Sequence, residues 1–231
     1  MEVQPRAQVA VVYNGLDKAA FASISDDVVE RTHRALNLPR RFLLAVGHFE
    51  PRKNYVLLID ALAKLRDAGV LQPLVIIGNN SGEKARVEAR IAHHGLSASV
   101  TLRSGLSDLE VRCAYQSCTA FVFPSAYEGF GIPILEAMAA GRPPVLSDIP
   151  VFREITQNQG VYFPPKDVEA MADAIHRVLS SDATRDRLVQ YGLRRVEDFS
   201  FKSLALQVRE LYQAKESVGR EEYAAIRGST N

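Results

Sequence analysis

The chain has 231 residues, of which 47% are hydrophobic and 24% are charged, as is typical of a globular protein. Its 28 Lys and Arg residues nearly balance 27 Asp and Glu residues, so the formal net charge is only +1 and no nucleic-acid partner is expected. No apolar run approaches the roughly 18 residues of a membrane span. The first residues lack the pattern of a signal peptide, and we expect a cytoplasmic location.

The predicted elements begin with an apolar run at 8–13 that leads into the turn signal Asn14-Gly15 and a less periodic segment up to Pro39. From residue 41 onward, apolar runs of strand length alternate with segments of helical periodicity. We predict strands over 42–46, 74–78, 99–102, 120–123, 145–146 and 161–163. We predict helices over 55–67, 83–93, 108–117 and 134–140, and an almost entirely helical region from 167 to about 217.

Strands that are apolar throughout, each followed by a helix, indicate a parallel sheet covered on both faces. The predicted fold is therefore α/β, a Rossmann-like domain with a doubly wound parallel sheet, and its ligands should lie at the carboxyl ends of the strands. We expect a linker with a first strand over 1–16, the Rossmann-like domain over 17–197, a C-terminal helix over 198–217 and a disordered tail over 218–231.

The most informative segment is 124–141, in which Glu128 and Glu136 flank the glycines Gly129 and Gly131. Glycines at a strand-to-helix turn let a ligand approach the backbone closely. The free N–H groups at the start of the helix suit a phosphate, and carboxylates accept hydrogen bonds from the hydroxyls of a polyol. A sugar nucleotide combines a diphosphate, a ribose diol and hexose hydroxyls, and so matches all three features.

Two adjacent cations, Arg52 and Lys53, come just before the predicted helix that follows the first buried strand. A solvated surface pair would explain them, but a cation at a helix N-terminus is slightly unfavourable. A phosphate partner is the better explanation, because it would form charge-assisted hydrogen bonds with both side chains.

Three residue pairs look like metal or redox sites but have simpler interpretations. Cys113 and Cys118 lie on different faces of a predicted helix and are interpreted as small buried side chains. The adjacent His93 and His94 do not face each other on a helix, so we expect a solvated helix end. The acidic pair at 26–27 lacks a third acid and is interpreted as a helix cap. We therefore expect no metal site and no cofactor.

The spacing from Glu128 to Glu136 resembles the Glu-x7-Glu motif of the GT-B glycosyltransferases of family 4, which include many mannosyl- and glucosyltransferases. Three further segments resemble family motifs in the same order: 13–17 the opening of the C-terminal domain, 46–54 the first phosphate-binding loop, and 105–108 the loop near the base. The resemblance covers about 9–212, and the agreement of several motifs in order makes it specific. The chain is thus similar to the C-terminal, donor-binding domain of a retaining GT-B glycosyltransferase.

The resemblance implies that a hexose of the mannose or glucose type is transferred from a GDP- or UDP-linked donor to a hydroxyl of a saccharide or lipid-linked acceptor. It implies that Glu128, Arg52 and Lys53 are catalytic, with Glu128 near the transferred sugar and Glu136 at the ribose. The residues expected to bind the donor are Gly47, Arg52, Lys53, Gly105, Glu128, Gly129, Phe130, Gly131 and Glu136. Taken by itself, Phe130 is interpreted as a packing residue.

One position departs from the family pattern. Many members carry Arg directly after the glycine that corresponds to Gly47, whereas this chain has His48 there. Arg52 is therefore expected to supply the second cation beside Lys53. The family's acceptor-binding N-terminal domain is not recognisable in this sequence, so we expect it as a missing partner. The full enzyme would associate peripherally with the inner face of the membrane.

Two other functions stay open at this point. A sugar-nucleotide epimerase of the same fold would need acid and base residues at C2 of the sugar, and the sequence shows no such pair beyond the donor motif. A non-catalytic nucleotide-sugar-binding or interaction module is the second alternative. Hydrolysis products of the donor would distinguish a transferase from an epimerase, and a complete lack of nucleotide binding would favour the interaction module.

Overall fold

A computed structural model of the chain describes residues 10–22 and 24–213. These residues fall into two compact units, and the larger unit spans Lys18–Glu197. Its sheet has the strand order β3-β2-β1-β4-β5-β6, and every neighbouring pair of strands is parallel. The strands are β1 (Leu43–Val46), β2 (Leu74–Ile77), β3 (Val100–Arg103), β4 (Ala120–Phe123), β5 (Pro144–Ser147) and β6 (Val161–Phe163).

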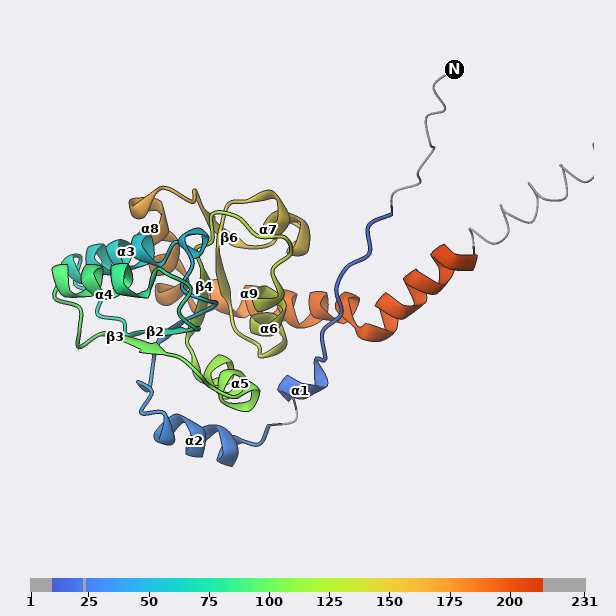
Figure 1. Cartoon of the computed structure of the whole chain (residues 1–231), viewed down its shortest axis with the longest axis horizontal. Coiled ribbons are helices and arrows are strands. Elements are labelled where there is room, and N and C mark those ends of the chain that lie inside the picture. The colour runs from blue at the N-terminus through green and yellow to red at the C-terminus, as the bar shows by residue number, and fades with distance from the viewer. Residues whose placement is uncertain (1–9, 23, 214–231) are drawn as a thin grey trace, which may run out of the picture. The chain divides into compact units, whose positions relative to one another are not determined.

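Helices connect the strands and cover both faces of this sheet (Figure 1). Helices α3, α4 and α8 pack together on one face, while α2 packs against α5, and α6 against α9, elsewhere in the unit. The helical elements are α1 (Ala19–Ala22), α2 (Asp26–Ala35), η1 (Pro51–Lys53), α3 (Tyr55–Asp67), α4 (Lys84–His93), α5 (Asp108–Ser117), α6 (Ile132–Ala139), α7 (Pro150–Ile155), α8 (Val168–Ser180), α9 (Asp182–Arg195) and η2 (Val196–Phe199).

The core lies on both sides of the sheet because the strands are apolar at almost every position. In β1, Leu43 and Ala45 share one face and join a buried cluster with residues of α3 and α8. Successive side chains of a strand point to opposite faces, so the residues between them face the other helix layer. This two-sided burial explains the uninterrupted apolar runs in the sequence.

The second face of the sheet is packed with aromatic side chains. Phe121 of β4 lies 5.5 Å from the ring of Tyr115 on α5, and Phe123 stacks on Phe152 of α7 at 5.0 Å, measured between ring centroids. The cysteines at 113 and 118 are free and buried in this region, which confirms the interpretation made from their spacing. Burial raises the pKa of the Cys118 thiol to about 12, so the thiol stays protonated and unreactive.

The parallel sheet confirms the predicted doubly wound, Rossmann-like α/β fold. The strands 120–123 and 161–163 and the helices 55–67 and 108–117 have the predicted bounds. Helix α7 is absent from the prediction, because its six residues are too few to show a periodic pattern. Two predicted helix starts are wrong: α6 spans Ile132–Ala139 rather than 134–140, and the N-cap of α2 is Ser25 rather than the acidic pair at 26–27.

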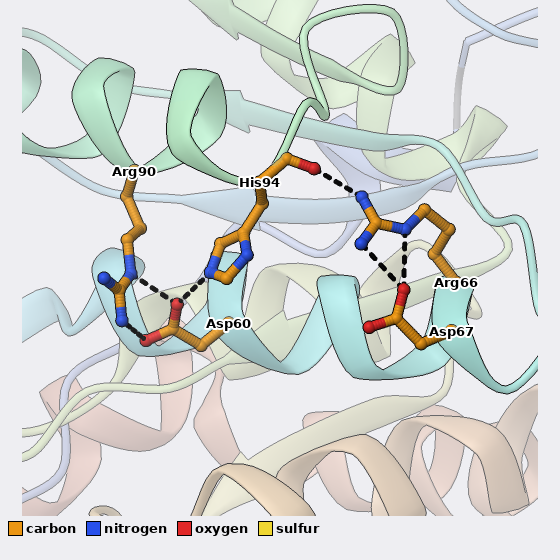
Figure 2. Close-up of polar contacts among 5 residues, drawn as sticks. All are labelled: Asp60, Arg66, Asp67, Arg90 and His94. Atoms are coloured by element: carbon orange, nitrogen blue, oxygen red, sulfur yellow. Dashed lines mark hydrogen bonds and ion pairs between the residues drawn. The ribbon is translucent and has the colours of Figure 1, made fainter.

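Helices α3 and α4 are joined by the carboxylate of Asp60 (Figure 2). It accepts hydrogen bonds from Arg90 Nε and Nη2, at 2.5 and 2.8 Å, and lies 2.7 Å from His94 Nε2. Partial burial alone would raise the pKa of Asp60, but the hydrogen bonds from Arg90 and His94 outweigh that effect and lower it. His94 is therefore not the solvated helix end expected from the sequence, since its partner comes from a different helix.

The smaller unit, as far as it is described, comprises residues 10–17 and 198–213. Leu16 and Ser200 form an isolated parallel bridge, and the rings of Tyr13 and Phe199 lie 5.6 Å apart. Residues 201–213 are helical. The predictions for 1–9, for helix over 214–217 and for the tail over 218–231 fall outside the described residues. Within the described ranges, no helix has the length and apolar character needed to cross a bilayer.

Candidate functional site

The loop after β1 passes so close to its neighbours that side chains are excluded at two positions. Gly47 has a φ of 148°, and a Cβ atom there would lie 2.9 Å from Lys53 Cε. A Cβ atom on Gly78, at the end of β2, would lie 1.9 Å from the carbonyl oxygen of Gly47. Only glycine fits such a contact. The two glycines therefore allow the loops after β1 and β2 to approach each other closely at the carboxyl edge of the sheet.

The turn η1 presents Arg52 and Lys53 at this edge and is tied to the loop after β4. Asn54 follows it in the left-handed conformation, with a φ of 59°, and its side-chain amide donates to the carbonyls of Pro124 and Pro165 at 3.2 and 2.8 Å. The backbone carbonyl of Arg52 accepts a hydrogen bond from Ala126 N at 2.8 Å. Strands β1 and β4 are parallel neighbours, so their carboxyl ends meet and these contacts can form.

The two cations converge on a single carboxylate, that of Glu128 in the loop after β4. Lys53 Nζ lies 2.6 Å from Glu128 Oε1, and Arg52 Nη1 lies 2.6 Å from Glu128 Oε2. The Lys53 and Glu128 side chains are only 7% and 10% exposed, whereas that of Arg52 is 38% exposed. Arg52 Nε also binds Glu50 Oε2 at 2.6 Å. We call Lys53, Arg52, Glu128 and Glu50 the ion cluster.

The ion cluster is partly shielded from solvent, which strengthens its interactions. Lys53 Nζ lies 4.8 Å from the ring centroid of Phe123, so an aromatic face supplements its carboxylate partner. Burial alone would lower the pKa of Arg52, but its hydrogen bond to Glu128 and the charges of Glu128 and Glu50 raise it. Arg52 is therefore held in its charged form.

The glycine turn after Glu128 leads into α6. A Cβ atom on Gly129 would have no other atom within 4 Å, so this position opens to space that a ligand could occupy. Gly131 has a φ of 130° and is the N-cap of α6, and no side chain caps the helix there. Pro133 has no N–H group, and Ile134 N already donates to the Gly131 carbonyl at 2.9 Å. The positive end of the α6 dipole still favours an anion at this turn. Phe130 is half-buried between the two glycines.

The second glutamate of the motif has different surroundings. Glu136 lies on α6, is half-buried, and accepts a hydrogen bond from the hydroxyl of Tyr115 on α5 at 2.9 Å. Burial raises the pKa of Glu136, the Tyr115 hydroxyl partly opposes this, and the charge of Asp108 adds to it. Glu136 is thus oriented by a neutral donor, in contrast to Glu128, which lies between two cations.

The loops after β1, β2 and β3 are linked by hydrogen bonds through Asn79. Its backbone N–H donates to His48 Nδ1 at 3.3 Å, and its side-chain oxygen accepts from Gly105 N at 3.2 Å. The hydroxyl of Ser104 donates to the carbonyl of Gly78 at 2.6 Å. Gly105, predicted near the base, therefore belongs to a connected set of loops along the same edge of the sheet. The side chain of His48 is exposed, and its backbone carbonyl accepts a hydrogen bond from Glu50 N at 2.8 Å.

The structure brings together Gly47, Arg52, Lys53 and Glu128, which are separated by up to 81 positions in the sequence. Sequence reasoning placed Glu128 away from the cations, beside the hexose, and did not predict its pairing with them. It also missed Glu50, which binds Arg52, and Asn54, which joins the loops. An Asn between a turn and a helix is a signal for the left-handed conformation, and this signal could have indicated Asn54.

A family model described as "Glycosyl transferases group 1" matches residues 28–195. Among the relatives, O-antigen chain mannosyltransferase B of Escherichia coli is 30% identical over 173 residues, which are 74% of this chain and 45% of that protein. The matched region spans from about a quarter to about half the length of the first curated relatives.

Two solved structures show the same fold. The Anabaena protein HepE, solved in complex with UDP, superimposes with a TM-score of 0.78 at 20% identity, covering 89% of this chain and 57% of that one. The C-terminal domain of a glycosyl transferase group 1 family protein from Francisella tularensis gives 0.67 at 22% identity, covering 81% of this chain and 100% of that one. The chain therefore belongs to the glycosyl transferases group 1 family, with the Rossmann-like fold of the C-terminal half of a GT-B glycosyltransferase.

Proposed function

We propose that the chain is the donor-binding domain of a retaining hexosyltransferase. It would bind a nucleoside diphosphate sugar and transfer the hexose to a hydroxyl of a saccharide or lipid-linked acceptor. The observation that carries this proposal is the ion cluster, in which two cations and the first glutamate of the motif lie beside an open glycine turn. Those groups suit a ligand that joins an anion to a polyol.

The proposed roles follow from the surroundings of each residue. Arg52, Lys53 and the N–H groups of the Gly129–Gly131 turn would bind the diphosphate and stabilise the charge that develops on it as the sugar leaves. Glu136, oriented by Tyr115, would accept hydrogen bonds from the ribose hydroxyls. In comparable sites one donor to a developing anion contributes roughly 3–4 kcal/mol to the transition state.

The retaining mechanism is proposed from the resemblance to the family. A double displacement would require a carboxylate nucleophile at the sugar, whereas the role proposed for Glu128 is to accept hydrogen bonds from the sugar hydroxyls. We propose attack by the acceptor on the same face as the leaving group, with the departing diphosphate as the base.

The identity of the donor is proposed from the relatives. The E. coli relative is named a mannosyltransferase, and the Anabaena neighbour was solved with UDP. We propose a mannose- or glucose-type hexose linked to GDP or UDP, with no cofactor. An acceptor-binding N-terminal domain would complete the cleft, and the whole enzyme would associate peripherally with the membrane.

Removal of the two cations tests the proposed function. The Arg52→Ala and Lys53→Ala variants should each bind UDP or GDP at least about tenfold more weakly, because each loses a charge-assisted hydrogen bond to phosphate. Affinity for uridine and guanosine should change little. Titration calorimetry of the four ligands would measure both effects, and circular dichroism would confirm that each variant is folded.

A variant carrying Lys64→Ala and Arg177→Ala is a matched control, because it removes two exposed cations of α3 and α8 outside the ion cluster. Its nucleotide affinities should equal those of the wild type. Equal losses for nucleosides and diphosphates in the Arg52 and Lys53 variants would contradict the proposed phosphate contacts. A wild-type chain that binds none of the nucleotides or nucleotide sugars would refute the proposed function as a whole.

A further inference from the structure

We propose that Glu128 competes with the donor diphosphate for Lys53 and Arg52, and that this competition makes the site prefer a sugar-bearing nucleotide to the bare diphosphate. The inference rests on the proposed function and adds a specificity-determining role for Glu128. In the absence of ligand the carboxylate takes the place of the phosphate. When the donor binds, the diphosphate takes over the cations and the carboxylate turns to the sugar.

Both cations are already paired with Glu128 in the absence of ligand. Each oxygen of Glu128 is 2.6 Å from one cation, and the carboxylate side chain is only 10% exposed. A diphosphate brought to the same two cations would meet this anion at close range in a partly buried site. Like charges at such distances repel strongly when water is excluded. The diphosphate must therefore displace Glu128 to reach both cations.

The buried position of Lys53 makes the exchange necessary. Its ammonium is buried, and the carboxylate in contact with it is Glu128. A buried charge left without a counter-ion is strongly destabilising, so Lys53 requires an anion in either state. Arg52 differs, because it is more exposed and keeps Glu50 as a second partner. Glu128 and a diphosphate therefore cannot both form a close ion pair with Lys53.

The displaced carboxylate of Glu128 needs new partners. Freed from the cations, Glu128 would lie at the open glycine turn and need new hydrogen-bond donors. The hydroxyls of a transferred hexose are such donors, but a bare nucleoside diphosphate has none at that end. With the bare diphosphate, Glu128 would regain its cations and weaken binding. After sugar transfer, the same return of Glu128 would favour release of the diphosphate product.

The Glu128→Gln variant tests this exchange, because glutamine has nearly the same shape but no charge. Titration calorimetry with UDP, GDP and inorganic pyrophosphate should show at least about tenfold tighter binding to the variant, equivalent to 1.4 kcal/mol. The preference for UDP-glucose or GDP-mannose over the matching diphosphate should fall by at least the same factor. Pyrophosphate should also raise the Tm of the variant more than that of the wild type, since Lys53 lacks its counter-ion there.

Glu169→Gln is the matched control, because it removes one negative charge from an exposed pair with Lys64 on another part of the surface. Its affinities should equal those of the wild type. If Glu128→Gln does not fold, Glu128→Asp carries the same test, since a side chain one methylene shorter cannot hold both cations at their present distances. It should bind pyrophosphate more tightly than the wild type does.

The possible failures are distinguishable. Suppose that the wild type binds nucleoside diphosphates, and that the Glu128 variants bind these ligands and pyrophosphate no more tightly than the wild type does. The competition is then refuted, while the proposed function stands. If no nucleotide binds to any variant, the proposed function fails. Pyrophosphate then decides the inference alone: tighter binding to the Glu128 variants would support an anion exchange at Lys53, and unchanged or absent binding would overturn it.

Discussion

At the scale of single residues, the fold requires glycine at some positions of the site but would accept a side chain at Gly129. Gly78 touches the backbone of Gly47, and Gly131 has a positive φ and is surrounded by apolar side chains. Gly129 has neither constraint, since its φ is not positive and no atom would lie within 4 Å of an added Cβ. A requirement for glycine at this position would therefore come from the ligand rather than from folding.

Gly129→Ala should leave the free energy of unfolding within about 0.5–1 kcal/mol of the wild type. Its affinity for UDP or GDP should fall at least about tenfold, because the new methyl group would occupy the space through which the diphosphate approaches the backbone. Denaturant unfolding and titration calorimetry would measure the two effects. Gly78→Ala is the contrasting variant and should lose about 2 kcal/mol of stability or more, since its Cβ would overlap the Gly47 carbonyl. Unchanged nucleotide affinity in Gly129→Ala would contradict a ligand at this turn.

At the scale of elements, the loops that form the site are held by contacts between helices as well as between strands. Helix α3 starts directly after the ion cluster, and α4 follows the loop that contains Asn79. Asp60 joins these two helices through Arg90 and His94 (Figure 2). A change in this contact would therefore affect the stability of the layer on which the site loops rest.

Asp60→Asn should lower the free energy of unfolding by about 1–3 kcal/mol at pH 7, because it replaces a charged hydrogen-bond acceptor in a partly buried pair. The pKa of Asp60 is lowered in the folded chain, so its stabilising effect is present above the ordinary aspartate pKa of about 3.9 and is lost as the pH falls through the lower folded value. The difference in unfolding free energy between wild type and variant should narrow below about pH 4. Denaturant titrations across this pH range would measure it.

Asp67→Asn is a control on the same helix. Asp67 binds Arg66 near the end of α3 (Figure 2), and its side chain is 65% exposed. Exposed pairs of this kind contribute little, so the change in unfolding free energy should stay below about 0.5–1 kcal/mol. If Asp67→Asn lowered the free energy of unfolding as much as Asp60→Asn does, the contact of Asp60 between the helices would contribute no more than an exposed ion pair.

At the scale of the whole molecule, the strand order places the site. The sheet runs outward from β1 to β3 on one side and from β4 to β6 on the other, so the chain reverses its direction of progress between β1 and β4. Loops leave the sheet in opposite directions at such a point and open a crevice between them. The ion cluster joins the loops of these two strands.

The net charge of the chain is only +1, so the proposed anionic donor would depend on local cations rather than on an overall field. Under the proposed function, Arg52 and Lys53 would supply the positive charge that Mg²⁺ supplies at other sites. For UDP and for GDP, the affinity measured with Mg²⁺ should therefore agree within about twofold with that measured with a chelator. Titration calorimetry under both conditions would check this. A tenfold weakening on chelation would show that a divalent ion takes part in binding.

The sequence by itself determined the parallel Rossmann-like sheet, because apolar strands and amphipathic helices leave local patterns. It also identified the individual residues of the motifs, since Glu128, Gly129 and Glu136 lie within nine positions of one another. Short elements such as α7 escaped prediction because six residues carry too little periodicity.

Only the tertiary structure decided which side chains meet. Lys53 and Glu128 are 75 positions apart, and their contact depends on β1 and β4 being neighbours at the point where the strand order reverses. His94 likewise finds Asp60 on another helix, 34 positions away. No pattern along the chain reports such pairs, because they arise from the packing of whole elements. The ion pairs of the site, in which both cations already bind a carboxylate, could therefore be seen only in the folded molecule.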